Sequence, residues 1–130
     1  MSDDYLKIKE KHSKIYANFK NSYCSAFDCE IVWNSKGFNH IVYKSGGRER
    51  NREDQIIRFK YLELAKELVE HTNTFQEYEY IDSKNVYYWG LIAIYKNIKL
   101  KVIIKRNGKL GKLYFYSVIP HYVTSVKRDK

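Results

Sequence analysis

The sequence predicts an α+β domain in which N-terminal helices pack on one face of a C-terminal antiparallel sheet. Two observations support this prediction. In the first 71 residues, two segments repeat apolar residues every three or four positions, the spacing of an amphipathic helix. From residue 75 onward, short segments rich in aromatic and β-branched residues are separated by turn-forming residues, which is typical of a β-meander. With 130 residues and 44% hydrophobic composition, the chain is expected to form one domain, 1–130.

Two helices are expected before the sheet. The first starts at Ser2 and ends near Lys20, with its apolar residues on one face. The second follows Asn51, a residue type that caps helices, and ends near His71. These helices supply the apolar faces that would cover one side of the sheet.

The segment between the two helices is expected to be extended. Alternation of apolar and polar residues predicts a strand over 27–33, followed by a turn at 34–37. Residues 38–43, FNHIVY, are interpreted as a short extended segment that ends at Ser45, Gly46 and Gly47.

Four strands are expected in the C-terminal part, and three to five would fit the pattern. Their predicted ranges are 75–81, 86–95, 98–106 and 113–119. Turns are expected at 82–85, at 96–97 and from Asn107-Gly108, with Pro120 stopping the last strand. Residues from about 122 to 130 are expected to form a basic, frayed tail.

Positive charge is concentrated at one end of the chain. The net charge is +9, yet residues 1–95 contain 14 Lys and Arg against 14 Asp and Glu. Residues 96–130 contain ten Lys and Arg and a single acid. Because strand side chains alternate between faces, Lys99, Lys101 and Lys105 are expected on one solvated face of the sheet. A basic surface on an otherwise neutral domain favours a polyanionic partner such as RNA.

Several classes of protein fit the sequence poorly. No apolar run reaches about 18 residues, and the N-terminus lacks the order of a signal peptide, so a cytoplasmic protein without a membrane span is expected. The two cysteines and four histidines lack metal-ligand spacing, so no metal and no other cofactor is expected. Phosphate-binding glycine motifs are also absent.

Residues 40–50, HIVYKSGGRER, combine groups that suit metal-independent cleavage of RNA. RNA carries its own nucleophile, the 2′-hydroxyl, so a protein need only move protons and stabilise charge on the phosphate. His40 could transfer protons, and Lys44, Arg48 and Arg50 could bind phosphate. Lys99, Lys101 and Lys105 would extend the phosphate-binding surface. A structural role for His40 in an exposed loop remains the alternative.

Aromatic residues on the last strand could bind bases. Tyr114 and Tyr116 offer rings on which bases of a single strand can stack. Strict alternation would place both tyrosines on the face opposite Phe115 and Ser117. If Phe115 packs inward, Tyr116 is therefore the residue that faces the solvent.

The segments FNHIVYKSGGRERN, DQIIRFKYLELAKELV, YYWGLIAI, LKVIIKRNG and YFYSVIP resemble the nuclease superfamily that joins barnase, EndoU, colicin ribonucleases and RelE. The likeness runs from Phe38 to Pro120 and is greatest for the phage and polymorphic-toxin branches. It implies metal-free cleavage of RNA on an open sheet face. It also implies that His40 transfers protons, that Lys44 and Arg50 contact phosphate, and that Ser117 lines the cleft. A β-bulge could bring both Ser117 and Tyr116 to the cleft.

The sequence therefore predicts a toxin-like, metal-independent endoribonuclease with His40, Lys44, Tyr116 and Ser117 as its catalytic candidates. Its RNA substrate could be single-stranded or structured, and an acidic antitoxin or immunity protein is a candidate partner. Two alternatives remain open. One is a non-catalytic nucleic-acid-binding module, and the other is an interaction protein whose basic face binds an acidic protein.

Overall fold

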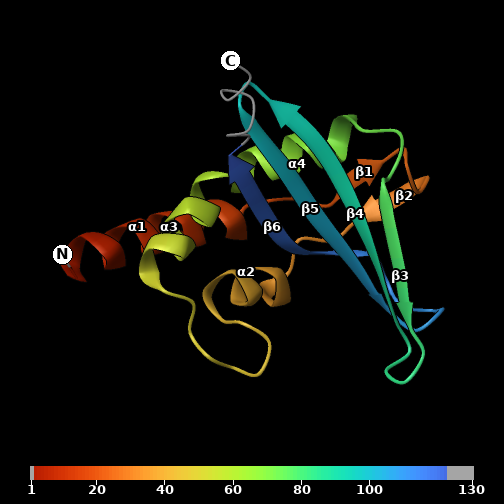
Figure 1. Ribbon diagram of the computed structural model, residues 1–130, viewed down its shortest axis with the longest axis horizontal. Helices are drawn as coiled ribbons and strands as arrows, with labels where there is room; N and C mark the ends of the chain where they lie inside the picture. The colour runs from red at the N-terminus through yellow and green to blue at the C-terminus, as the bar shows by residue number, and fades with distance from the viewer. Residues whose placement is uncertain (1, 123–130) are drawn as a thin grey trace, which may run out of the picture.

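The computed structural model describes residues 2–122 and contains four helices and six strands in that range (Figure 1). In chain order they are α1 (Ser2–Ala17), β1 (Ser22–Cys24), β2 (Cys29–Ile31), α2 (Ser35–Val42), α3 (Arg52–Lys60), α4 (Leu62–His71), β3 (Glu77–Ile81), β4 (Val86–Tyr95), β5 (Ile98–Asn107) and β6 (Tyr114–Tyr122). Of the tail predicted for residues 122–130, Tyr122 belongs to β6, and residues 123–130 lie outside the described part of the chain. None of the described helices has the length and apolar character needed to cross a membrane.

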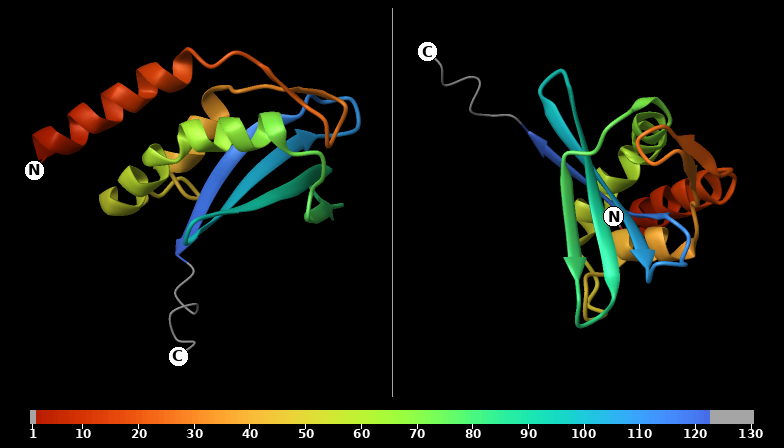
Figure 2. Two further views of the ribbon diagram at one scale, coloured as in Figure 1. Left: turned by 90° about the horizontal axis from the view of Figure 1, so that it is seen from above. Right: turned by 90° about the vertical axis from the view of Figure 1, so that its right-hand side faces the viewer.

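The predicted α+β class is confirmed. Strands β3, β4, β5 and β6 form an antiparallel sheet in that order, and the helices precede it in the chain. Helix α4 lies behind β4 and β5 in Figure 1, and the helical layer lies on one side of the sheet in Figure 2. The opposite face of β4 and β5 carries no helix (Figure 1). That uncovered face presents Lys99, Lys101 and Lys105, as the alternation predicted.

One hydrophobic core joins the two layers. The sheet contributes Leu91, Leu100, Val102, Ile104, Phe115 and Val118, and the helices contribute Ile41, Val42, Phe59, Leu62, Ala65, Leu68 and Val69. The core residues of β5 recur at every second position and those of the helices at helical spacing, so burial of their side chains explains why the layers associate.

The extended segment predicted for 38–43 is wrong, because residues 38–42 belong to helix α2 and only Tyr43, which follows the helix, is extended. The side chain of Asn34 accepts a hydrogen bond from the backbone N–H of Lys36 and caps the helix. Gly37, Ile41 and Val42 are buried at helical spacing against the core. The β-branched pair Ile41-Val42 favoured a strand locally, and the buried helical face outweighs that preference.

The strand predicted for 27–33 is present only over Cys29–Ile31, which is β2, and residues 27 and 28 lie in a turn. Strands β1 and β2 make a small hairpin in which Cys24 lies opposite Cys29, and residues 25–28 form its turn. Asp28 adopts a positive φ of 51°, a conformation that aspartate tolerates in turns. Both cysteines are free thiols, with Cys24 buried and Cys29 exposed.

The helix predicted from Asn51 to His71 is divided into two. Asn51 caps α3 by accepting a hydrogen bond from the N–H of Asp54, as expected. The helix then breaks at Tyr61, whose N–H donates to the carbonyls of Arg58 and Phe59. No glycine or proline marks the break, and Phe59 and Leu62 on either side of Tyr61 are both buried in the core. Helix α1 ends at Ala17 rather than near Lys20.

The last strand departs from the prediction in two ways. It continues through Pro120, which lies opposite Leu100, and ends at Tyr122. Proline is tolerated there because β6 is at the edge of the sheet and pairs with β5 alone. On its outer side there is no neighbouring strand that would need the backbone N–H that proline lacks. The register also shifts, since Ile103 lies opposite Ser117 whereas Ile104 lies opposite Phe115. Tyr116 is therefore the extra residue of a β-bulge.

Candidate functional site

Helix α2 places His40 at the uncovered face of the sheet. The helix contacts β6, and Gly37 allows its backbone to approach Phe115 closely. One turn further on, the imidazole of His40 packs on the ring of Tyr116, with 4.0 Å between ring centroids. A residue of the first half of the chain is thereby brought to the C-terminal sheet.

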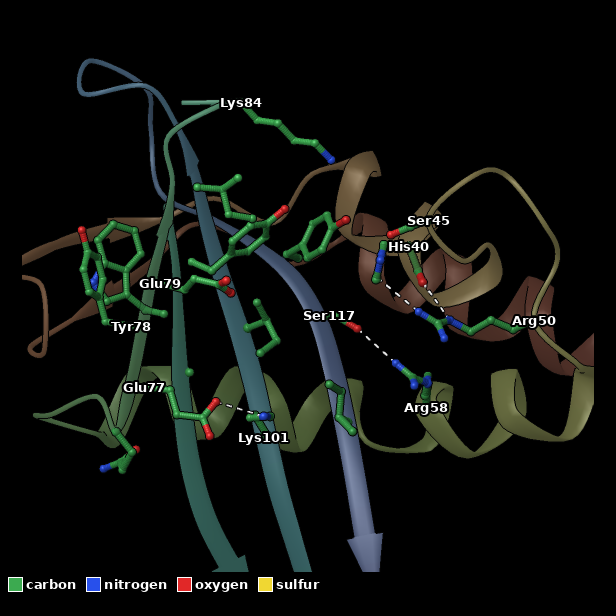
Figure 3. A pocket seen from close by; sticks show the side chains of 18 residues that line it. His40, Ser45, Arg50, Arg58, Glu77, Tyr78, Glu79, Lys84, Lys101 and Ser117 are labelled. Carbon is green, nitrogen blue, oxygen red and sulfur yellow. Dashed lines mark hydrogen bonds and ion pairs between the residues drawn. The ribbon is translucent and has the colours of Figure 1, made fainter. Parts of the chain in front are cut away.

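A cleft of about 1040 Å³ opens beside His40. Its floor is formed by β3, β4, β5 and β6 (Figure 3). His40, Arg50 and Arg58 lie on one side of the cleft, and Glu77 and Glu79 of β3 lie on the other (Figure 3). The cleft is therefore cationic at the helical side and acidic at the outer strand.

Two arginines near His40 share a single carboxylate. Nε of Arg50 donates to the carbonyl of His40 at 3.0 Å, and its Nη2 lies 3.4 Å from His40 Nδ1. Nη1 of Arg58 donates to Ser117 Oγ and to the carbonyl of Val118, both at 3.1 Å. Asp54 lies 3.2 Å from Nε of Arg58 and 3.9 Å from Nη1 of Arg50. Both arginine side chains are only 11% exposed, so their charges are largely removed from water.

Lys105 adds a third cation at the same point. Its Nζ lies 4.6 Å from the centroid of Tyr116 and 5.4 Å from that of Tyr88. Partial burial alone would lower the pKa of Lys105, but Tyr114, Tyr88 and Tyr116 raise it overall. Lys105 is therefore an ammonium at neutral pH, and it lies over the ring of Tyr116, on which His40 packs.

These surroundings keep His40 neutral. Burial, followed by the charges of Arg50, Arg58 and Lys105, lowers the pKa of His40 to about 4. Arg50 donates toward Nδ1, so the neutral ring carries its proton on Nε2. Burial raises the pKa of Tyr116, whose hydroxyl therefore stays protonated. The free site is thus a neutral imidazole and a phenol surrounded by three cations and one carboxylate.

Replacing His40 by glutamine is expected to reduce the acid sensitivity of the fold. Because the folded pKa is below the unfolded value of about 6.5, the unfolded chain takes up a proton first as the pH falls. The stability of the wild type relative to His40→Gln should therefore fall by on the order of 1 kcal/mol between pH 7 and pH 4, discounted for the partly exposed ring. Urea unfolding at both pH values, in buffer without phosphate, measures this difference. An unchanged difference would contradict the shifted pKa.

The β-bulge brings both alternative residues of the last strand to the cleft. Tyr116 and Ser117 line it together, whereas Phe115 and Val118 on either side of them are buried in the core. Ser117 is buried, and its hydroxyl accepts a hydrogen bond from the guanidinium group of Arg58. Strict alternation would have placed only one of the two residues on this face.

The remaining predicted residues are divided between the large cleft, a second cleft and the exposed surface. Lys44 is exposed and Tyr114 is buried, and both line a second, smaller cleft. Lys101 lines the large cleft, but its Nζ donates to Glu77 at 2.9 Å. Lys99 and Arg48 are exposed and line neither of these two clefts. Of the three lysines expected to form one phosphate-binding surface along β5, Lys105 and Lys101 therefore line a cleft, and the charge of Lys101 is paired with that of Glu77.

Three residues at the site were not selected from the sequence. Arg58 follows Asp54 by four positions, which is a detectable helical ion pair, but its distant partner Ser117 is not apparent from that spacing. Tyr88 lies opposite Lys105, a pairing that only the strand register reveals. Ser45 follows α2 and lines the large cleft together with Tyr116.

Among residues 2–122, no three His, Cys, Asp or Glu side chains converge in a way that could hold a metal ion. Comparisons with protein-family models, with curated proteins and with solved structures found no match to this chain. The fold and the site therefore define the protein by themselves. It is an α+β protein in which helix α2 places an imidazole against the antiparallel sheet, within a cluster of cations and tyrosines.

Proposed function

We propose that this chain is a metal-independent endoribonuclease that cleaves RNA by attack of the 2′-hydroxyl on the adjacent phosphodiester. The observation that supports this most strongly is the charge balance around His40. Arg50, Arg58 and Lys105 face the imidazole, and Asp54 is the carboxylate that pairs with the two arginines. Two arginines that are only 11% exposed and share one carboxylate are unfavourable unless an anion completes the site. A phosphodiester supplies that charge.

The chemistry follows from these positions. A phosphate bound to Arg50 and Arg58 reduces the positive potential at His40 and raises its pKa from about 4. Once Nη2 of Arg50 donates to the phosphate instead of to His40, Nδ1 of the imidazole is free, and it accepts the proton of the 2′-hydroxyl as the 2′-oxygen bonds to phosphorus. The bond from phosphorus to the 5′-oxygen breaks, and the ammonium of Lys105 donates a proton to that oxygen. The arginines and Lys105 stabilise the charge on the phosphorane-like transition state. Solvent returns the proton from His40 to Lys105.

The test is cleavage of RNA by the purified protein in EDTA. A synthetic RNA should give fragments with 2′,3′-cyclic phosphate ends. The same oligonucleotide with a single 2′-deoxy substitution should lose cleavage at that position, because the attacking hydroxyl is missing there. Cleavage at the deoxy position would contradict the proposed attack by the 2′-hydroxyl. Activity that EDTA removes would contradict a metal-independent reaction.

A second candidate is a non-catalytic RNA-binding module. The contact between Arg50 and Nδ1 of His40 favours this candidate. In a non-catalytic module, an imidazole of low pKa that accepts a hydrogen bond from Arg50 would have the structural role of positioning that arginine. Such a module would bind RNA with strong dependence on salt and produce no fragments. An acidic protein, such as an inhibitor of a toxin-like nuclease, is the partner that would compete with RNA for the same cations.

A further inference from the structure

A second cleft adjoins the first at the proposed reaction centre. Its volume is about 430 Å³, and it shares His40, Ser45 and Tyr116 with the large cleft. It lies between α2 and the start of β6, on the side of His40 away from β3. His40 and Tyr116 therefore form a ridge with a cleft on each side. A polymer whose reacting bond lies at His40 must extend into both clefts.

The smaller cleft has the chemistry of a nucleotide-binding site. Its lining combines three lysines, three tyrosines and two amide side chains: Lys36, Lys44, Lys105, Tyr43, Tyr114, Tyr116, Asn39 and Asn107. None of the described residues that line it is acidic, whereas Glu77 and Glu79 line the large cleft. Cations can hold phosphate, rings can stack on a base, and amides can pair with base edges.

Two features of the lysines and tyrosines fit a bound nucleotide. Lys36 lies 5.4 Å from the ring centroid of Tyr114, and Lys105 lies 4.6 Å from that of Tyr116, so the two lysines approach from different elements. Tyr43 is 44% exposed and follows α2 directly, where a base can reach its ring. A cleft of this size is within the range of about 300 to 1,000 Å³ that holds small ligands.

We infer that the smaller cleft binds the nucleotide next to the scissile phosphate of a single-stranded RNA. The base of that nucleotide stacks on Tyr43, and Lys36 and Lys44 contact the following phosphate. This inference rests on the proposed function, because it takes the scissile phosphate to lie at His40. It adds a substrate requirement, since an RNA must extend past the cleaved bond to bind fully.

The test compares two double variants with the same loss of charge. Lys36→Gln with Lys44→Gln removes the proposed phosphate contacts, and Lys7→Gln with Lys11→Gln removes two exposed lysines of α1 that line neither cleft. Fluorescence anisotropy measures binding of a labelled eight-nucleotide RNA at several salt concentrations. The cleft variant should lower the slope of log affinity against log salt by about 0.7 per lost contact, and the α1 variant should leave it nearly unchanged. Equal slopes in the two variants would overturn the inference.

A further variant tests the stacked base. Tyr43→Ala should weaken binding of the RNA by about 5- to 150-fold, the usual effect of losing one stacked base, and should leave binding of an abasic strand of equal length unchanged. Equal losses for both strands would overturn stacking on Tyr43.

If RNA binds as inferred but is never cleaved, the proposed nuclease activity fails while the binding site stands. If RNA is cleaved but the cleft variants behave as wild type, the nuclease stands and the binding site fails. Binding of acidic polypeptide in place of RNA would also overturn the site.

Discussion

His40→Ala is expected to lower the rate of RNA cleavage by about 10²- to 10⁴-fold, the range that a positioned proton-transfer group contributes. His40 is the imidazole that lies against Tyr116 and faces Arg50, Arg58 and Lys105. Its removal leaves the phosphate-binding cations in place, so binding of RNA should change much less than turnover. Single-turnover cleavage and anisotropy on the same RNA separate the two quantities.

The matched control is His71→Ala. His71 is exposed at the end of α4, where its ring contacts the carbonyl of Glu67, and it lines neither cleft. This variant should cleave RNA at the wild-type rate. Circular dichroism must show that His40→Ala remains folded. A folded His40→Ala protein that retains its turnover within about tenfold would remove His40 from the mechanism, since the smallest contribution of such a group is about 10²-fold.

Gly37→Ala is expected to destabilise the fold by about 1 to 3 kcal/mol and to reduce activity with it. A Cβ at this position would lie 2.5 Å from both the backbone oxygen and a ring carbon of Phe115, and 2.8 Å from the hydroxyl of Tyr16. The N–H of Phe115 donates to the carbonyl of Val32, so this backbone cannot easily shift. Alanine favours a helix by only about 1 kcal/mol over glycine, and the overlap outweighs that gain.

Gly37→Ala should affect catalysis because the same helix positions His40. Displacing α2 from β6 moves the imidazole from Tyr116, and an error of about 1 Å can lower a rate by roughly 10²-fold. Urea unfolding and cleavage assays below the transition measure the two effects separately. Ser35→Ala, at an exposed position of the same helix, should change neither strongly. A Gly37→Ala protein as stable as the wild type would contradict the close packing of α2 on β6.

The sheet was the part of the fold that the sequence predicted best. Strand β4 has the bounds that were expected, 86–95, and β5 extends only to Asn107 beyond its predicted end. Alternation of side chains is a local property of one strand, so it can be recognised without knowledge of its partners. The alternation also predicted that Lys99, Lys101 and Lys105 share a face. It did not predict that Lys101 pairs with Glu77, because the two residues meet only across β4.

Helix α2 was the clearest failure of prediction from sequence. Residues 38–43 contain four aromatic or β-branched side chains that favour a strand, and eight residues are too few for a strong helical period. Its helical form depends on the Asn34 cap and on burial of Gly37 and Ile41 against elements far along the chain. The segment was recognised for its chemistry, but its conformation was decided by packing.

The sequence by itself determined the fold class, the uncovered basic face and the choice of His40 and Tyr116 as site residues, because composition and alternation are local. Only the tertiary structure decided that Arg58 and Tyr88 join them and that the β-bulge directs both Tyr116 and Ser117 into one cleft. These features depend on contacts between α2, α3 and the sheet, and on one unpaired residue in the register of β6. Contacts at such separations carry no signal in the spacing of residues along the chain.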